Sequence, residues 1–433
     1  MKALIVGTGG VGESMAAIAK RRDPKAEIFP KIVLADYDLK RAQKASQRLG
    51  EARFPAEQVD AHDVDAVAAL AEKHDVDIIC NLLPVDFDIP MMQAALKARR
   101  HYLDTGMSLS TPHPTDPYNK VGELLGHEQF ALNEEFVKIG KLALLGQGIE
   151  PGMADYYARY AADHLFDEID EIGVRDGATL DLPGHEGPAF VFSIWTTIEE
   201  CTNPAVVWEA DTGFRTVKPF SEMEEFCLPA GIGYQEMGHV EHDEVVHMGR
   251  NAHLLKGVKR VTFKYAVGQE FIDAIGTLKA LNLHRTQPAK VGGVSVSPRD
   301  VVAAVAPDPA ELCKGLVGIT SSGTWVKGRK DGLERQVYLY QVADAQEVLE
   351  RLGTQVITAQ TAFTAVITLE LLETGKLAGY QGNPESGVRS PEEFHAEPYV
   401  GLMAAYEFPG GLMEIDSEYK RVQEHATLTA PLR

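Results

Sequence analysis

Two carboxylates and one histidine of this sequence are placed where they could transfer a proton. Asp104 directly follows a short β-prone run, and Glu150 directly precedes Pro151. His239 opens the densest titratable cluster, residues 239–247, in which histidines and acids are interspersed. A carboxyl in an enclosed site has a raised pKa and becomes a base near neutral pH, while imidazole titrates there unaided. Asp104, Glu150 and His239 are therefore the predicted catalytic residues.

Each of these residues also has a structural interpretation. An aspartate at a strand end can cap a loop, and a glutamate beside a proline can stabilise a helix N-terminus. The cluster at residues 239–247 is also typical of a solvated polar loop. Its HxxH spacing matches no recognised ligand frame, and the four cysteines are scattered without a CxxC pair. The sequence therefore predicts no metal site.

A glycine-rich segment near the N-terminus has the spacing of a dinucleotide-binding turn. The β-prone run 2–6 precedes it, Gly7, Gly9 and Gly12 fit GxGxxG, and a helical pattern follows. A second apolar run ends at Asp36, where a carboxylate would accept hydrogen bonds from ribose hydroxyls. The order of these features predicts a helix N-terminus that faces the phosphates of a dinucleotide.

Later strand ends complete the predicted cofactor site. Short apolar runs alternate with helical patterns through residues 1–150, which predicts a doubly wound parallel sheet, a Rossmann domain. Ligands of such sheets lie beyond the carboxyl ends of the strands. The predicted cofactor-binding residues are Gly7, Gly9, Gly10, Val11, Gly12, Asp36, Ala61, Asn81, Leu82 and Thr105.

The remaining sequence predicts an α/β protein with two further parts. Residues 151–350 contain irregularly spaced strands and hairpins, which favour an α+β domain for substrate binding and dimerisation. Residues 351–433 contain a long apolar helix at 358–372, and we expect this helical C-terminal segment to return and pack on the first domain.

The charge and hydropathy of the chain narrow the range of partners. The 433 residues include 42 basic and 63 acidic side chains, and the formal net charge of −21 opposes binding to nucleic acid or anionic lipid. No uninterrupted apolar run approaches a membrane span, and glycines interrupt the apolar start, unlike in a signal peptide. We expect a cytoplasmic protein with neither nucleic-acid nor membrane partners.

Taken together, these motifs resemble those of the saccharopine dehydrogenase-like oxidoreductases. The resemblance rests on the glycine turn and on residues 102–105, 148–153 and 323–332, and it covers nearly the whole chain.

Two branches of that family share the resemblance. Residues 102–175 and 298–344 are most similar to carboxynorspermidine dehydrogenase, whereas residues 190–226 are most similar to lysine 6-dehydrogenase. Both alternatives stay open at this point.

The resemblance implies an NAD(P)-dependent enzyme that acts on a C–N bond. Its substrate would be an amino acid or an amino-acid-derived secondary amine, including polyamine derivatives, and the chain would form a homodimer. Asp36 favours NAD because a carboxylate repels a 2′-phosphate, although Lys40 and Arg41 keep NADP compatible. A non-catalytic NAD(P)-binding sensor is the alternative from a different class, since a fold alone does not fix function.

Overall fold

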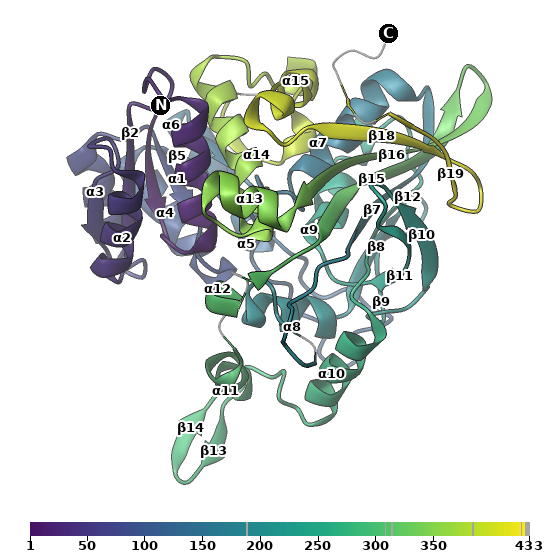
Figure 1. Ribbon diagram of the computed structural model, residues 1–433, viewed down its shortest axis with the longest axis horizontal. Coiled ribbons are helices and arrows are strands. Elements are labelled where there is room, and N and C mark those ends of the chain that lie inside the picture. Colours follow the sequence, from purple (N-terminus) through teal and green to yellow (C-terminus); the bar gives the residue numbers. More distant parts are fainter. Residues whose placement is uncertain (188, 308, 313–314, 383–384, 426, 429–433) are drawn as a thin grey trace.

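The computed structural model describes residues 1–433 except 188, 308, 313–314, 383–384, 426 and 429–433. It contains a parallel seven-stranded sheet on the left of Figure 1 and a mixed ten-stranded sheet on the right. Helix α14 (Val356–Glu373) contacts both α1 (Gly10–Arg22), beside the first sheet, and β16 (Leu333–Asp344) of the second. The two sheets are thus joined through a shared helical layer.

The first sheet has the strand order β3-β2-β1-β4-β5-β6-β17, and all of its strands are parallel. Its central strands are buried on both faces, which explains why they appear in the sequence as unbroken apolar runs. The predicted Rossmann sheet is confirmed, and the C-terminal segment adds β17 as a seventh strand. The bounds are β1 (Lys2–Val6), β2 (Lys31–Asp36), β3 (Ala56–Gln58), β4 (Ile78–Asn81), β5 (His101–Leu103), β6 (Leu142–Leu144) and β17 (Gly387–Arg389).

Helices that begin at local caps cover this sheet. Asp38 accepts a hydrogen bond from the Lys40 amide and starts α2, and Asp63 does the same for the Ala66 amide at the start of α3. The helices of this domain are α1, α2 (Leu39–Leu49), α3 (Val64–His74), α4 (Asp88–Ala98), α5 (His127–Ala131) and α6 (Asn133–Ile139).

Helix α14 returns to the first domain and packs along α1. The hydroxyls of Ser14 and Thr358 lie 3.0 Å apart across this contact. The helix is long and apolar enough to span a membrane, but 78% of its residues are buried inside the protein. Its all-round apolar character therefore reflects a position in the core.

The second sheet has the order β10-β11-β12-β7-β15-β16-β18-β19, with β8 and β9 paired beside β12. It curls so far that the amide of Cys227, on one edge strand, donates to the carbonyl of Tyr419 at the opposite edge. The bounds are β7 (Glu168–Ala178), β8 (Ala205–Glu209), β9 (Gly213–Val217), β10 (Glu224–Leu228), β11 (Gly233–His239), β12 (Arg260–Tyr265), β15 (Ile319–Lys330), β16, β18 (Gly410–Ile415) and β19 (Arg421–His425).

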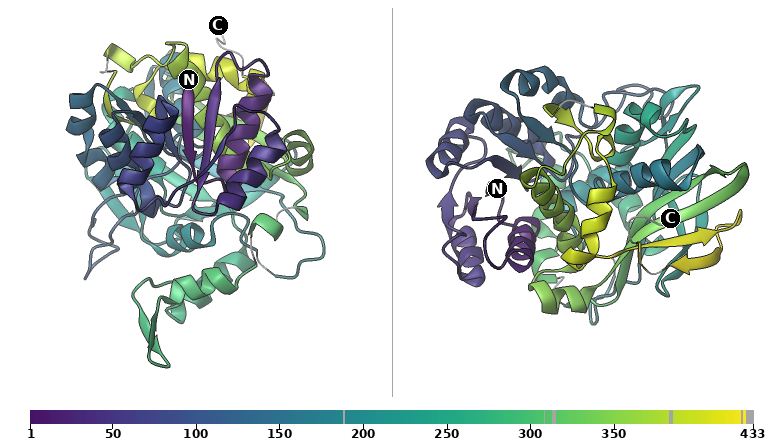
Figure 2. Two further views of the ribbon diagram at one scale, coloured as in Figure 1. Left: turned by 90° about the vertical axis from the view of Figure 1, so that its left-hand side faces the viewer. Right: turned by 90° about the horizontal axis from the view of Figure 1, so that it is seen from above.

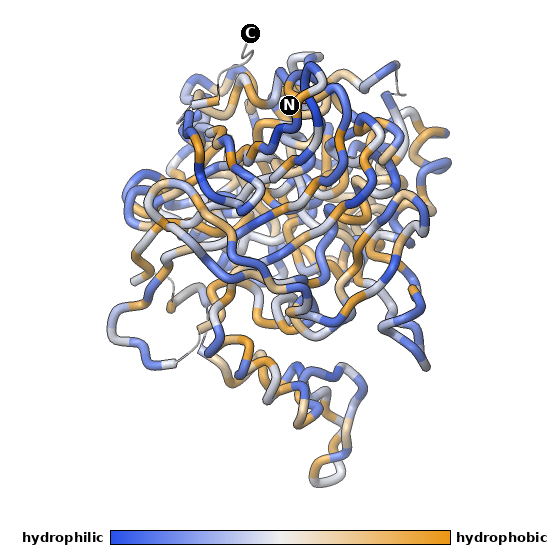
Figure 3. Tube along the Cα trace, turned by 90° about the vertical axis from the view of Figure 1, so that its right-hand side faces the viewer, coloured by the Kyte–Doolittle hydropathy of each residue, from blue (hydrophilic) through white to orange (hydrophobic). Residues whose placement is uncertain are grey.

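An arm made of α10, the β13–β14 hairpin and α11 projects from the body (Figures 1 and 2). Orange, apolar residues are visible along it in Figure 3, and Val291, Val294 and Val305 are largely exposed. The helices and hairpin strands outside the first domain are α7 (Met153–Tyr160), α8 (Ile194–Thr202), α9 (Asp243–Arg250), α10 (Gln269–Ala280), β13 (Ala289–Val291), β14 (Val294–Val296), α11 (Pro298–Val305), α12 (Pro309–Leu312), α13 (Ala345–Leu352), α14 and α15 (Glu397–Met403).

Candidate active site

The glycine turn after β1 has the geometry that a pyrophosphate requires. Gly7 has a φ of +98°, and its amide donates to the carbonyl of Ala35 on the neighbouring strand. A Cβ atom at Gly12 would lie 2.1 Å from the Gly7 carbonyl oxygen, so only glycine lets α1 approach β1 this closely. A Cβ at Gly9 would meet nothing within 4 Å, so backbone there is open to an approaching phosphate. The turn therefore fits a dinucleotide.

Asp36 ties the end of β2 to this turn. Its Oδ2 accepts a hydrogen bond from the Thr8 amide at 3.0 Å, and its Oδ1 accepts one from the Asp38 amide at 3.0 Å. Each carboxylate oxygen has a second lone pair, so the side chain can still receive ribose hydroxyls. The guanidinium of Arg41 lies 3.9 Å from Asp36 and is half exposed.

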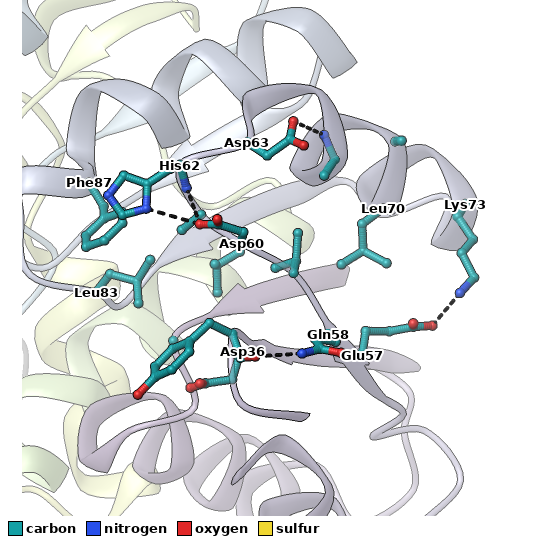
Figure 4. Close-up of a pocket in the computed structure, with 17 residues that line it drawn as sticks. Asp36, Glu57, Gln58, Asp60, His62, Asp63, Leu70, Lys73, Leu83 and Phe87 are labelled. Carbon is teal, nitrogen blue, oxygen red and sulfur yellow. Dashed lines mark hydrogen bonds and ion pairs between the residues drawn. The ribbon is translucent and has the colours of Figure 1, made fainter. Parts of the chain in front are cut away.

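A hollow of about 1030 Å³ opens beside Asp36 (Figure 4). Gly7, Asp36 and Ala61 of the predicted cofactor set line it, together with the aromatic ring of Phe87 and the ring of His62, whose centroids are 4.7 Å apart. This hollow has the position expected for the adenosine half of a dinucleotide, beyond the carboxyl ends of β2 and β3.

Three predicted cofactor residues lie at or just beyond the ends of β4 and β5, at the same rim. The Asn81 amide group donates to Asp88 at 2.8 Å and to the Tyr102 hydroxyl at 3.2 Å, so it is held by the protein. The carbonyl of Leu82 lies 2.7 Å from the place where a Gly7 Cβ would stand, and the Thr105 carbonyl lies close to Gly148. Backbone segments that follow several strands therefore pack closely against one another at this rim.

Gly10 and Val11 form the first turn of α1, where the helix meets α14. A Cβ at Gly10 would lie 2.7 Å from the Thr358 methyl carbon, so this glycine serves the contact with α14. Val11 is partly buried and packs against the core. Gly10 and Val11 therefore serve the packing of the helix start, whereas the backbone at Gly9 is the part of the turn that is open to a ligand.

Asp104 is buried at the end of β5, and both of its oxygens are occupied. Oδ1 accepts from the Gly146 amide and Oδ2 accepts from the Gln129 side chain, each at 2.7 Å. Burial raises its pKa well above the usual range. These two hydrogen bonds connect the end of β5 to the loop after β6 and to α5. The catalytic role of Asp104 stays a prediction.

Glu150 lies among carboxyls that come from the second sheet. Its Oε1 is buried and has no hydrogen-bond partner among the described residues, while its carboxyl lies near that of Asp176 on β7, and each of the two carboxyls affects the pKa of the other. Burial and the neighbouring acids raise the pKa of both groups. Further acids surround the pair, and burial raises the pKa of Glu200 to about 7. We call this group the acidic cluster, and it consists of Glu150, Asp176, Glu200, Glu241, Asp243 and Glu244.

His242 is the basic residue that the structure brings to the acidic cluster. Its Nδ1 lies 2.6 Å from Glu244 Oε2, and its ring stacks on Phe263 with centroids 4.0 Å apart. Burial disfavours its charge, but Glu244 and Glu200 outweigh that effect and raise its pKa to about 10. The sequence singled out the segment that contains it, but not this residue.

His239 lies on the other face of the second sheet. Its ring lies between the Phe263 carbonyl, at 3.0 Å, and Glu222, at 3.3 Å. Burial and the charges of Lys264 and Arg175 lower its pKa to about 4. Arg175 and Asp176 are consecutive in β7, so their side chains point to opposite faces. The structure therefore does not bring His239 together with Glu150, and its predicted catalytic role gains no support from this position.

Comparison with known proteins supplies the family. Residues 3–144 match the family model of the saccharopine dehydrogenase NADP binding domain, and residues 148–407 match the saccharopine dehydrogenase C-terminal domain. The chain belongs to the saccharopine dehydrogenase family. It is thus an NAD(P)-dependent oxidoreductase that acts on a C–N bond of an amino-acid-derived amine, as the resemblance implied.

Relatives and a solved structure agree with this family. The chain is 28% identical over 427 residues to carboxynorspermidine synthase of Vibrio alginolyticus, which covers 96% of this chain and 98% of the relative. It is 27% identical over 410 residues to carboxyaminopropylagmatine dehydrogenase of Synechocystis, covering 94% and 96%. Apo saccharopine dehydrogenase (L-Glu forming) of Saccharomyces cerevisiae has the same fold, with a TM-score of 0.66, 14% identity and coverage of 96% and 100%.

Proposed function

We propose that this chain oxidises, or forms by reduction of the imine, a secondary amine that links a carboxylated chain to a polyamine or to agmatine. The observation that supports the proposal is the acidic cluster beside the cofactor rim. Among the described residues, six carboxyls gather there, whereas the cations beside them are His242 and, near Asp243, His247. A site with this excess of negative charge binds a cation far better than a neutral or anionic group.

Relatives support the polyamine class. Two proteins that match nearly the whole chain are named carboxynorspermidine synthase and carboxyaminopropylagmatine dehydrogenase. Both names describe a carboxylated group attached to a cationic chain, which is the kind of molecule that the acidic cluster would hold. Saccharopine and lysine carry less positive charge, so they suit the cluster less well.

The chain's residues would bind the amine and receive its proton. When bound, the nicotinamide cofactor supplies the hydride acceptor or donor. Burial raises the pKa of Glu150 and of Asp176, so one of these two carboxylates would accept the proton of the substrate ammonium group near neutral pH. The surrounding carboxyls would hold the remaining cations of the substrate and fix its orientation.

Several expectations remain part of this proposal. A homodimer is what the family resemblance implies, whereas a cytoplasmic location and the lack of nucleic-acid and membrane partners are predictions from the sequence and its charge of −21. The assignment of NAD over NADP rests on Asp36 and is also a prediction.

A substrate panel tests the proposed function. The purified chain is mixed with NAD or NADP and with carboxynorspermidine, carboxyaminopropylagmatine, saccharopine or lysine, and absorbance of the reduced nicotinamide is followed. We expect kcat/KM to be at least tenfold higher for the carboxyalkyl polyamine or agmatine derivatives. A preference for saccharopine or lysine would overturn the substrate class. Cofactor binding without turnover on any amine would favour the sensor.

A further inference from the structure

Three buried side chains outside the acidic cluster converge on one point. Asp155 on α7, His247 on α9 and Glu392 on a 3₁₀ turn (Pro391–Glu393) are all 0% exposed. One potential ligand atom from each lies within 4.8 Å of the other two. Among the described residues, Asp155 Oδ1, His247 Nδ1 and Glu392 Oε2 have no hydrogen-bond partner, although His247 Nδ1 and Asp155 Oδ1 lie 3.5 Å apart as an ion pair. We propose that these three residues form a site for a divalent transition-metal ion such as Zn²⁺.

The other polar atom of each side chain is already held in place. The Gly152 amide donates to Asp155 Oδ2 at 2.8 Å, and the Asn251 side chain donates to Glu392 Oε1 at 2.7 Å. The Ser390 hydroxyl donates to the same Glu392 oxygen at 2.8 Å. Outer contacts of this kind orient metal ligands and leave the inner atom free to coordinate.

The imidazole orientation supports a cation between the three atoms. His247 Nε2 lies 3.1 Å from the Met107 sulfur, and a proton on Nε2 would be donated to that sulfur. Nδ1 faces Asp155 Oδ1, 3.5 Å away. Burial lowers the pKa of His247, but Asp155 and Glu392 outweigh that effect and raise it to about 9, so without metal the contact is an ion pair, and a metal ion would take the place of the Nδ1 proton. Two buried carboxylates and a neutral imidazole balance the charge of one divalent ion.

The distances suit a small ion after modest movement. Tetrahedral zinc with bonds of about 2.0 Å separates its ligand atoms by about 3.3 Å. The 3.5 Å between His247 Nδ1 and Asp155 Oδ1 is close to that value. Ligand atoms of the three residues are up to 4.8 Å apart, so a side chain would rotate slightly toward the ion to coordinate it. Water would occupy the fourth position. A surface hollow of about 470 Å³ lies beside the site and is lined by Asn251, which donates to Glu392, and by the adjacent Glu393.

Such an ion would join three parts of the chain. Asp155 lies in the first turn of α7, directly after the loop that carries Glu150. The ion would therefore fasten that loop to α9 and to the returning C-terminal segment. The proposal does not depend on the substrate, and the sequence could not indicate it because its three residues are separated by at least 92 positions.

Metal binding by the full-length, tag-free protein tests the site. The protein is stripped with a chelator and dialysed against Zn²⁺ or Co²⁺, and bound metal is measured by mass spectrometry. We expect one ion per chain, a visible Co²⁺ spectrum of low coordination number, and a higher melting temperature with Zn²⁺. Glu392→Gln and Asp155→Asn, which keep shape and outer contacts, should each weaken metal binding at least tenfold.

Glu393→Gln is the matched control, because Glu393 lies on the same turn but accepts from the Ser390 amide instead. It should bind metal as the unaltered protein does. Less than 0.1 ion per chain in the unaltered protein would overturn the site, and the three residues would then be a buried ion pair. Equal metal binding by all variants, or equal loss in the Glu393 control, would also overturn it, and melting curves without metal confirm that each variant is folded.

Discussion

The carboxyl of Glu150 lies near that of Asp176, although one follows β6 of the first sheet and the other lies on β7 of the second. Burial and the neighbouring acids disfavour ionisation of both carboxyls and raise the pKa of each. This pair joins the cofactor rim to the acidic cluster. It is the group that we expect to exchange a proton with the substrate amine.

Glu150→Gln should lower turnover of the amine at least tenfold, equivalent to about 1.4 kcal/mol of barrier, because the amide cannot accept the proton. Asp176→Asn should do the same. NAD affinity, measured by titration calorimetry, should change little, since both residues lie away from the glycine turn. Asp104→Asn should also lower turnover, but through loss of its bonds to Gly146 and Gln129. Full turnover in Glu150→Gln and Asp176→Asn would exclude the pair as proton acceptor.

His242→Gln should shift the pH–rate profile of amine oxidation. The oxidation rate should rise as the pH increases through neutrality, because burial raises the pKa of Glu200 to about 7 and raises that of the Glu150–Asp176 pair. The positive charge of His242 lowers the pKa of Asp176 and Glu200. Its removal should therefore move the midpoint of the profile up by about one unit.

The titratable groups that face the pair come from several elements: Glu200 lies on α8, Tyr265 on β12 and Tyr338 on β16, and His242, Asp243 and Glu244 lie at the start of α9. His239→Gln is the matched control, since His239 lies on the opposite face. A midpoint that moves with His239→Gln but not with His242→Gln would contradict the assignment.

Thermal stability should fall between about pH 5 and pH 8. Burial raises the pKa of Glu200 and Glu241 to about 7, so the folded protein keeps protons that the unfolded chain has lost above about pH 4.5. Their contribution is complete below that pH and is lost as the pH rises through 7. The raised pKa of His242, about 10, acts in the same direction above pH 6.5. Melting temperatures at pH 5.5 and 8.0 measure this, and a higher value at pH 8.0 would be inconsistent with it.

The parts of the site that could be predicted from the sequence are those encoded locally. Gly7, Gly12 and Asp36 are close in sequence, and their spacing follows from one strand, one turn and one helix. A short apolar run likewise predicts the strand β5 that ends just before Asp104. Each of these inferences needed only neighbours within a few dozen residues.

The rest depends on contacts between distant segments. His239 and His242 belong to one sequence cluster, and only the pairing of β11 with β12 decides that His239 faces away from Glu150. Asp176 had no motif to mark it. The contact of Thr358 with Ser14 joins residues that are 344 positions apart. No local pattern carries such information.

Asp36→Ala should narrow or reverse a preference for NAD over NADP. The substitution removes a hydrogen-bond acceptor for the ribose and the charge that repels a 2′-phosphate, so the difference in binding free energy should change by about 1–3 kcal/mol. Arg41 would then face the phosphate without its carboxylate neighbour. Dissociation constants of both cofactors measure the effect. Asp38→Ala, two residues after Asp36, is the control. Equal affinity of the unaltered protein for NAD and NADP would refute the prediction.

Gly12→Val should abolish nucleotide binding and leave the second sheet folded. The added Cβ would stand 2.1 Å from the Gly7 carbonyl oxygen, so α1 must move away from β1 and carry its N-terminus out of reach of the phosphates. Gly276→Val in the projecting arm is the matched control, because a Cβ there meets nothing within 4 Å. Titration calorimetry with NAD and circular dichroism of both variants separate lost binding from lost folding. Undiminished NAD affinity in a folded Gly12→Val protein would show that the turn is structural and does not hold the cofactor.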